Sequence, residues 1–136
     1  MKLGFLSRIF EGALSIETTY NQCDKALSDL KAYNQKRQEA DFQISDEEKA
    51  ELDEVVNTAI TNATRIIEKE GDRNWPGVFR EMHKNLASLY LELDEHDKVR
   101  TACERLQDYG ETGRLDADEV LESLKEKEGE EGESAS

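Results

Sequence analysis

Residues 45–67, SDEEKAELDEVVNTAITNATRII, are the stretch of the chain that decides its fold most clearly. Ser45 and Glu48 have the spacing of a capping box, and acidic residues lie between them, where the helix dipole favours negative charge. Apolar residues then recur every three or four positions, which is the spacing of one helical face; they are Leu52, Val55, Val56, Ala59, Ile60, Ala63, Ile66 and Ile67. The sequence therefore predicts an amphipathic helix that ends before Gly71.

The same helical spacing covers most of the remaining chain. It predicts a long N-terminal helix over about residues 7–38, a helical hairpin over about residues 76–110, and a short last helix with Asp116 as its N-cap. We therefore expect an all-α fold of four or five antiparallel helices. Residues 1–124 are predicted to form a single helical domain, and residues 125–136, which are mainly charged, are predicted to form a disordered acidic tail.

The charge of the chain excludes some classes of partner. Its 136 residues include 32 acidic and 18 basic side chains, which give a formal net charge of −14. Nucleic acids and anionic membrane surfaces are repelled by such a charge, so direct binding to either is not expected. The chain has no signal-peptide pattern and no membrane-spanning run, which predicts a cytoplasmic protein. Cys23 and Cys103 have no metal-type spacing, so we interpret both as buried thiols in a reducing compartment.

Residues 83–106 resemble a tetratricopeptide repeat. Leu86, Ala87 and Tyr90 match its first helix, and Val99 matches a position of its second helix. The tryptophan, turn glycine and closing proline of such a repeat are replaced by His83, Asp94 and Glu111, and no second copy lies about 34 residues upstream. The resemblance implies a helical hairpin that holds a partner peptide or packs onto another subunit. An ordinary antiparallel helical hairpin is the alternative.

Residues 108–119, DYGETGRLDADE, look like a calcium-binding EF-hand loop. The ligands in register with such a loop are Asp108, Asp116 and Glu119. Two further ligand positions are Gly110 and Thr112, so two of the usual carboxylates are missing, and no second loop pairs with this one. The sequence thus leaves two interpretations open, a degenerate calcium sensor and a helix start that needs no metal.

Catalytic motifs are absent from the sequence, which contains two histidines and no nucleophile elbow or phosphate-binding glycine loop. We therefore expect a protein that is not an enzyme and needs no cofactor. Its expected role is that of an adaptor or assembly module, which binds a protein partner or a second copy of itself through an apolar helical surface. The alternative is an acidic inhibitor that mimics nucleic acid and occupies the site of a basic protein.

The residues predicted to contact a partner are large apolar or aromatic side chains, with one histidine among them. They are Leu3, Phe5, Leu6, Ile9, Phe10, Trp75, Phe79, His83 and Tyr90. A role in the core of the chain's own fold is the alternative for Trp75 and for the five N-terminal residues, whereas His83 is expected on a helix surface or in a groove.

Overall fold

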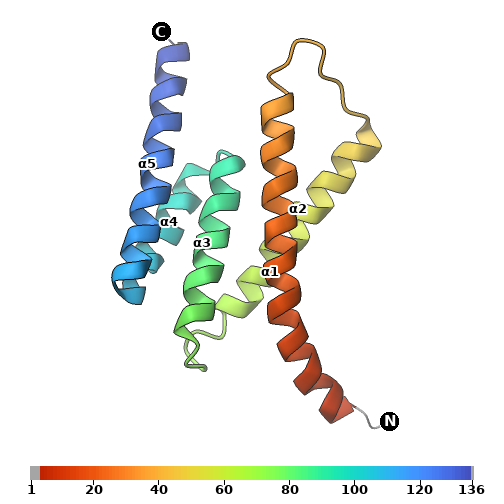
Figure 1. Cartoon of the computed structure of the whole chain (residues 1–136), viewed down its shortest axis with the longest axis vertical. Coiled ribbons are helices and arrows are strands. Elements are labelled where there is room, and N and C mark those ends of the chain that lie inside the picture. The colour runs from red at the N-terminus through yellow and green to blue at the C-terminus, as the bar shows by residue number, and fades with distance from the viewer. Residues whose placement is uncertain (1–3, 136) are drawn as a thin grey trace. The chain divides into compact units, whose positions relative to one another are not determined.

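The computed structural model describes the backbone of residues 4–135 and the side chains of residues 16–129. In this part of the chain the backbone forms five α-helices and one short 3-10 turn, without any β-strand (Figure 1). The helices are α1 (Gly4–Lys36), α2 (Asp46–Ile67), α3 (Pro76–Glu92), α4 (His96–Leu106) and α5 (Gly110–Ala135), and the 3-10 turn, η1, is Gln107–Tyr109. The expected all-α fold is therefore confirmed.

The chain divides into two compact units, Met1–Arg73 and Asn74–Ser136, which we call the first and the second unit. This division differs from the single helical domain predicted for residues 1–124. It arises because α1 packs on α2, whereas α3, α4 and α5 pack on one another. Hydrophobic periodicity identifies the apolar face of each helix, but it does not identify the helices that share a core.

In the first unit, α1 and α2 run antiparallel and are joined by residues 37–45 (Figure 1). The side-chain amide of Asn62 on α2 donates a hydrogen bond of 2.8 Å to Gln22 Oε1 on α1. The buried apolar side chains described in this unit are Cys23, Ala26, Leu30, Val56, Ala59, Ala63 and Ile66. The cysteine and the three alanines are small, which allows the two helices to approach closely. The apolar stripe predicted for residues 45–67 thus contributes to the core of this unit.

The start of α2 follows the sequence prediction. The backbone N–H of Glu48 donates a hydrogen bond of 3.1 Å to Ser45 Oγ, and the Ser45 hydroxyl is 3.2 Å from Glu48 Oε1. Three acidic residues lie in the first turn, where they stabilise the helix dipole. The prediction that a helix starts after Ser45 is therefore confirmed, and it rested on two local features, the capping residue and the acidic first turn.

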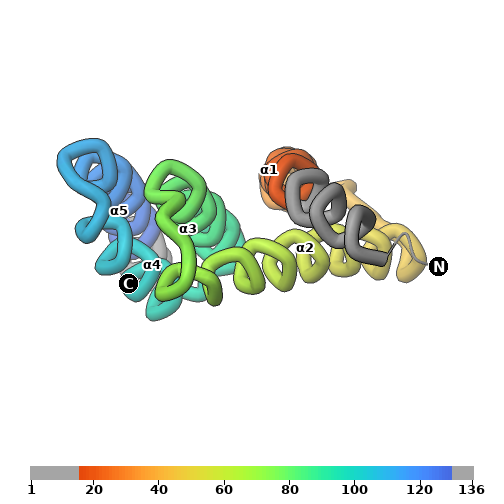
Figure 2. The backbone as a smooth tube through the Cα atoms, turned by 90° about the horizontal axis from the view of Figure 1, so that it is seen from below, coloured from red at the N-terminus to blue at the C-terminus, as the bar shows by residue number. Residues whose placement is uncertain are grey.

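In the second unit, α4 packs against both α3 and α5 (Figure 2). The core is contributed by all three helices and consists of Ala87, Leu91, Val99, Ala102, Cys103, Leu106, Ala117, Val120 and Leu124. The three residues between α3 and α4 make a tight turn, in which Asp94 adopts a φ of 60°. The Lys127 Nζ of α5 donates a hydrogen bond of 2.8 Å to the Leu91 carbonyl oxygen, which ties α5 to the end of α3.

Helix α5 begins earlier than the sequence predicted, at Gly110 and not after Asp116. Gly110 has a φ of 73°, a left-handed conformation that glycine adopts easily and that turns the chain from η1 into α5. At Gly113 a Cβ atom would collide with the carbonyl oxygen of Leu106, so only glycine fits this close approach of α5 to α4. Asp116 therefore lies inside the helix, and its predicted role as an N-cap is wrong.

Helix α5 also continues through residues 125–135, where the sequence predicted a disordered tail. Glu and Lys dominate this segment, and both residues have high intrinsic helix propensity. Arg100 of α4 donates a hydrogen bond of 2.6 Å to Glu128 Oε2, which adds to the contact made by Lys127. These contacts with neighbouring helices stabilise the helical conformation of the segment as far as Glu128.

Candidate functional site

A groove lies at the loop end of the α1–α2 hairpin, entirely within the first unit. Its volume is about 310 Å³, which is enough for one or two large side chains. The floor is apolar and consists of Ala32, Tyr33, Phe42, Ile44, Leu52 and Val55. We call this feature the hairpin groove.

The connecting segment between the helices supplies part of the floor of the hairpin groove. The Phe42 ring packs edge-on against Tyr33, with 5.8 Å between the ring centroids and an interplanar angle of 71°. Phe42 and Ile44 are two residues apart, a spacing that places both side chains on one side of an extended chain. Both residues line the groove, so a segment without regular structure carries part of the site.

Two cations lie near the ring of Tyr33. The Lys49 Nζ of α2 is 5.6 Å from the ring centroid, and the Arg37 Cζ, just after α1, is 5.7 Å from it. Each is within the distance at which a cation is attracted by the face of an aromatic ring. Tyr33 is therefore fixed by Phe42, Lys49 and Arg37 as a preformed part of the floor.

The hairpin groove exists because each of its helices has one helical neighbour within the unit. The residues at the centre of that contact, such as Ala59 and Ala63, are fully buried. Leu52 and Val55 lie beside this line on α2 and remain half-buried, as do Tyr33, Phe42 and Ile44. A helix that packs on one neighbour buries a single stripe, so apolar residues beside the stripe stay partly exposed.

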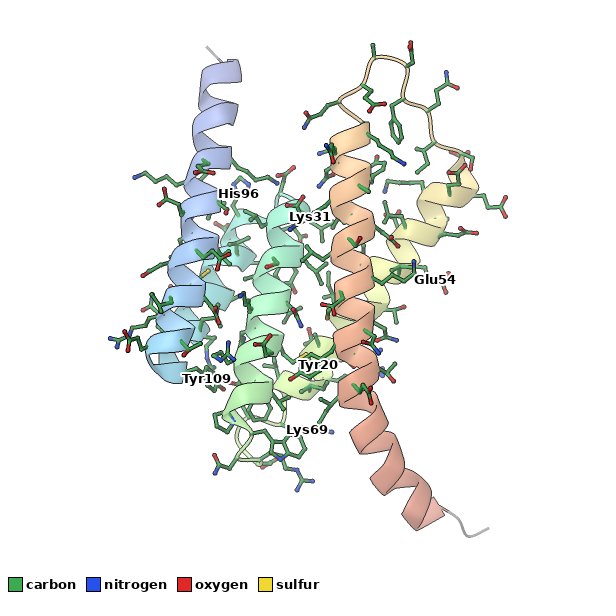
Figure 3. The ribbon with its side chains drawn as sticks, in the orientation of Figure 1. Tyr20, Lys31, Glu54, Lys69, His96 and Tyr109 are labelled. Carbon is green, nitrogen blue, oxygen red and sulfur yellow. The ribbon has the colours of Figure 1, made fainter. Side chains whose placement is uncertain are left out.

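The two rims of the hairpin groove differ in charge. On the α1 side lie Lys36 and an ion pair of 2.8 Å between Lys25 Nζ and Asp29 Oδ2. On the α2 side lie Glu48 and Glu51, which are exposed. They belong to residues 46–54, DEEKAELDE, where six acidic side chains accompany one lysine. Figure 3 labels Lys31 on α1 and Glu54 on α2, which are both exposed and lie outside the lining of the groove.

Of the predicted contact residues of the second unit, Phe79 and His83 are buried, and Trp75 and Tyr90 are half-buried. Phe79 is 2% exposed and His83 is 5% exposed. The His83 ring lies 6.0 Å from the ring of Tyr109, which Figure 3 labels near the start of α3. Tyr90 packs against the core of its unit, and Trp75 packs against Phe79 with 6.1 Å between the ring centroids. Phe79 and His83 are thus buried and Trp75 and Tyr90 are half-buried, and the role of all four in binding stays a prediction.

The predicted contact residues near the N-terminus lie outside the side chains that the structure describes. They are Leu3, Phe5, Leu6, Ile9 and Phe10. Their role in binding stays a prediction.

The residues predicted to form a calcium loop are helical from Gly110 onward, so they do not have the conformation of an EF-hand loop. Asp116 is 7% exposed, and its two carboxylate oxygens contact Arg80 Nη1 at 2.7 Å and Lys84 Nζ at 3.2 Å. Residues 16–129, whose side chains are described, contain no group of three or more potential ligands that could hold a metal ion. Asp116 therefore links α5 to α3 through an ion-pair cluster and is not placed beside Asp108 and Glu119 as a ligand set.

The ion pairs of Asp116 alter the chemistry of Arg80. Partial burial lowers the pKa of this guanidinium, but the hydrogen bond to Asp116 and the negative charge of Glu81 outweigh it and raise the pKa above its ordinary value. Arg80 is thus a permanent cation whose charge is matched by a buried carboxylate, which is a structural arrangement.

Both cysteines are buried, as the sequence predicted. Cys23 is 2% exposed and Cys103 is 1% exposed, and one lies in each unit. Burial raises the pKa of each thiol to about 11, with a contribution from Asp24 at Cys23. Both thiols are therefore protonated near neutral pH and are poor nucleophiles.

No protein-family model, curated protein or solved structure matches the chain. None of the helices in the described part of the chain combines the length and the apolarity of a membrane span. The α3–α4 hairpin has the helix–turn–helix form that the sequence predicted, and its likeness to a tetratricopeptide repeat stays a prediction from the sequence.

Sequence reasoning missed the hairpin groove. The available signal was the pair Phe42 and Ile44, two large apolar residues in a connection that is otherwise mainly polar. Apolar residues in a connecting segment indicate that it packs against a neighbouring element.

Proposed function

We propose that this chain is a non-enzymatic protein–protein interaction module and that its partner docks in the hairpin groove. The observation that carries the proposal is the floor of half-buried apolar side chains, bounded by charged rims, at one end of the first unit. Burying one large apolar side chain of a partner there contributes about 1.5–3 kcal/mol. The rims would orient the partner, because charged groups around an apolar contact act mainly on specificity and on the association rate.

The proposal is tested with one substitution made at two matched positions. Ala32 and Ala50 are both exposed, both helical and both in the first unit, but only Ala32 lines the hairpin groove. Ala32→Glu should abolish partner binding because it places a charge in the apolar groove, whereas Ala50→Glu should leave binding intact. The measurement is affinity capture from cell extract with the full chain as bait, quantified by mass spectrometry, with circular dichroism to verify the fold of each variant.

The two results have distinct meanings. Proteins that are captured by the wild-type chain and by Ala50→Glu, and lost with Ala32→Glu, support docking in the groove. An identical set of captured proteins for both variants would show that the groove binds none of them, and the proposal would be abandoned.

A second candidate function, an acidic mimic of nucleic acid, is favoured by one observation. The acidic side chains of residues 46–54 are exposed along the start of α2. Such a mimic would bind a basic protein through charge alone, so its affinity should fall steeply between about 50 and 200 mM salt. An interface based on the apolar groove should lose little equilibrium affinity over that range, because salt screens charges and leaves apolar burial unchanged.

A further inference from the structure

We infer that the occupant of the hairpin groove is a basic amphipathic helix of a partner protein, with its apolar stripe in the groove and its Lys or Arg flank on the α2 rim. This inference rests on the proposed function and specifies the chemistry of the partner. Its two supports are the charge of the rim and an equivalent arrangement in the second unit.

The second unit shows how a third helix completes a helical hairpin in this chain. The apolar residues of α5 that enter the core with α3 and α4 are Ala117, Val120 and Leu124, three to four positions apart. This is the spacing at which one helical face fits a groove between two others. In the described part of the first unit, α1 and α2 have no helix in the equivalent place, and the apolar floor from Tyr33 to Val55 remains half-buried.

In the second unit, the third helix, α5, carries a charge opposite to that of the α3 residues that it contacts. In the second unit, Asp116 of α5 lies at 2.7 Å from Arg80 and 3.2 Å from Lys84, both on α3. The inserted helix thus carries an acid where its neighbour carries bases. The α2 rim of the hairpin groove has the opposite sign, because Glu48 and Glu51 line it. By the same complementarity, the helix that fits there carries bases on that flank.

The remaining rim restricts the partner further. Lys36 lies on the α1 side, where the nearby Lys25 is already paired with Asp29 at 2.8 Å. A helix with bases on both flanks would bring one of them near Lys36. The occupant that matches both rims is therefore basic on the side of α2, and neutral or acidic on the side of α1.

The test uses two synthetic amphipathic peptides with the same leucine stripe, labelled with a fluorophore. In one peptide the flank beside the stripe carries Lys, and in the other it carries Glu. Fluorescence anisotropy with the full chain at about 150 mM salt should show about ten-fold tighter binding of the Lys peptide, because close like charges oppose the Glu peptide. Ala32→Glu should weaken binding of both peptides, and Ala50→Glu should weaken neither.

A pair of double variants separates the α2 rim from the net charge of the protein. Glu48→Lys with Glu51→Lys reverses the rim, whereas Glu47→Lys with Glu54→Lys makes the same change of net charge on the same helix outside the groove. The rim variant should lose or invert the preference for the Lys peptide, and the control variant should keep most of it. An equal loss in both variants would attribute the preference to net charge and overturn the inference.

Failure of this inference can be told apart from failure of the proposed function. If both peptides bind equally and Ala32→Glu weakens both, the groove is a docking surface but has no preference for a basic helix. If light scattering shows a dimer of the full chain that Ala32→Glu dissociates, a second copy occupies the groove and the inference is wrong. If no binding responds to Ala32→Glu, neither the inference nor the proposed function stands.

Discussion

In the part of the chain that the structure describes, the first unit pairs two helices, whereas the second packs three helices around one core. Two helices bury one line of contact and leave the residues beside it half-exposed, which produces the hairpin groove. Three helices enclose their core, and in the second unit even a carboxylate, Asp116, is nearly buried. The comparison shows that apolar side chains stay partly exposed where a helix packs on a single neighbouring helix.

Charge differs between the units as well. The first unit has ten basic and fifteen acidic residues, and the second has eight basic and seventeen acidic residues. Residues 46–54 alone carry a net charge of −5, which equals the net charge of the whole first unit. The negative charge of the first unit is therefore concentrated at the start of α2, beside the groove.

The largest expected effect concerns the reactivity of the two thiols. Because burial raises the pKa of Cys23 and Cys103 from 9.0 to about 11, the thiolate fraction of each at pH 8 falls about a hundred-fold below that of an ordinary cysteine. Labelling by a thiol reagent at pH 8 should therefore be slow in the folded protein and fast in the protein unfolded by urea. Fast labelling of either thiol at pH 8 would show that its unit opens readily.

The same thiols report the stability of each unit separately. In increasing urea, Cys23 should become reactive before Cys103, because among the side chains that the structure describes fewer apolar ones are buried in the first unit than in the second. Single-thiol variants, Cys23→Ala and Cys103→Ala, assign the signal to each unit. Equal urea midpoints would mean that the units unfold together as one cooperative domain.

Core substitutions should be costlier in the second unit than in the groove of the first. Leu106→Ala, at a site with 0% exposure, should lower the free energy of unfolding by about 2–5 kcal/mol. Leu52→Ala in the groove should lower it by about 1 kcal/mol, because part of that side chain is already in water. Urea denaturation followed by circular dichroism measures both, and similar losses would contradict the description of Leu52 as a half-buried residue.

Removing the charge of Asp116 should destabilise the second unit. Asp116→Asn leaves Arg80 and Lys84 without their buried carboxylate, and we expect a loss of about 1–3 kcal/mol in the free energy of unfolding. Asp118→Asn, two residues away and exposed, should change that free energy by less than about 0.5 kcal/mol. Thermal and urea denaturation of both variants provide the measurement. If the two effects are equal, the ion-pair cluster does not link α3 to α5.

The smallest effects come from two glycines of α5, for which opposite signs are expected. Gly113→Ala should lower the free energy of unfolding by about 1–2 kcal/mol, because its Cβ would collide with the Leu106 carbonyl oxygen and α5 would have to shift. Gly129→Ala should raise it by about 0.5–1 kcal/mol, because the site is open and alanine favours a helix. Calorimetry resolves both changes. Destabilisation by Gly129→Ala would contradict the helical extension of α5.

The sequence signals succeeded where local chemistry determines the structure. The cap at Ser45 was predicted correctly because the side chain of Ser45 and the first turn of α2 lie within a few residues of each other. The capping pattern at Asp116 led to a wrong helix start, because Gly110 and Gly113 allow α5 to begin earlier and Arg80, far away in the sequence, pairs with Asp116. Local patterns do not contain such long-range contacts.

The hairpin groove was not predictable for a similar reason. Its floor combines Tyr33 near the end of α1, Phe42 in the connection and Leu52 on α2, which meet only after the hairpin has formed. The amphipathic pattern of residues 45–67 marked Leu52 and Val55 as apolar, but it did not distinguish the centre of the helix contact from its edge.

The position of Phe42 and Ile44 in the connection has an evolutionary consequence. The buried residues that hold α1 to α2 lie on the helices, whereas these two floor residues lie in the connection between them. If a partner docks in the groove as proposed, mutations at positions 42 and 44 can change which side chains it accepts with little loss of stability in the helix pair. A hairpin of this kind can diverge toward new binding specificities while it keeps the same fold.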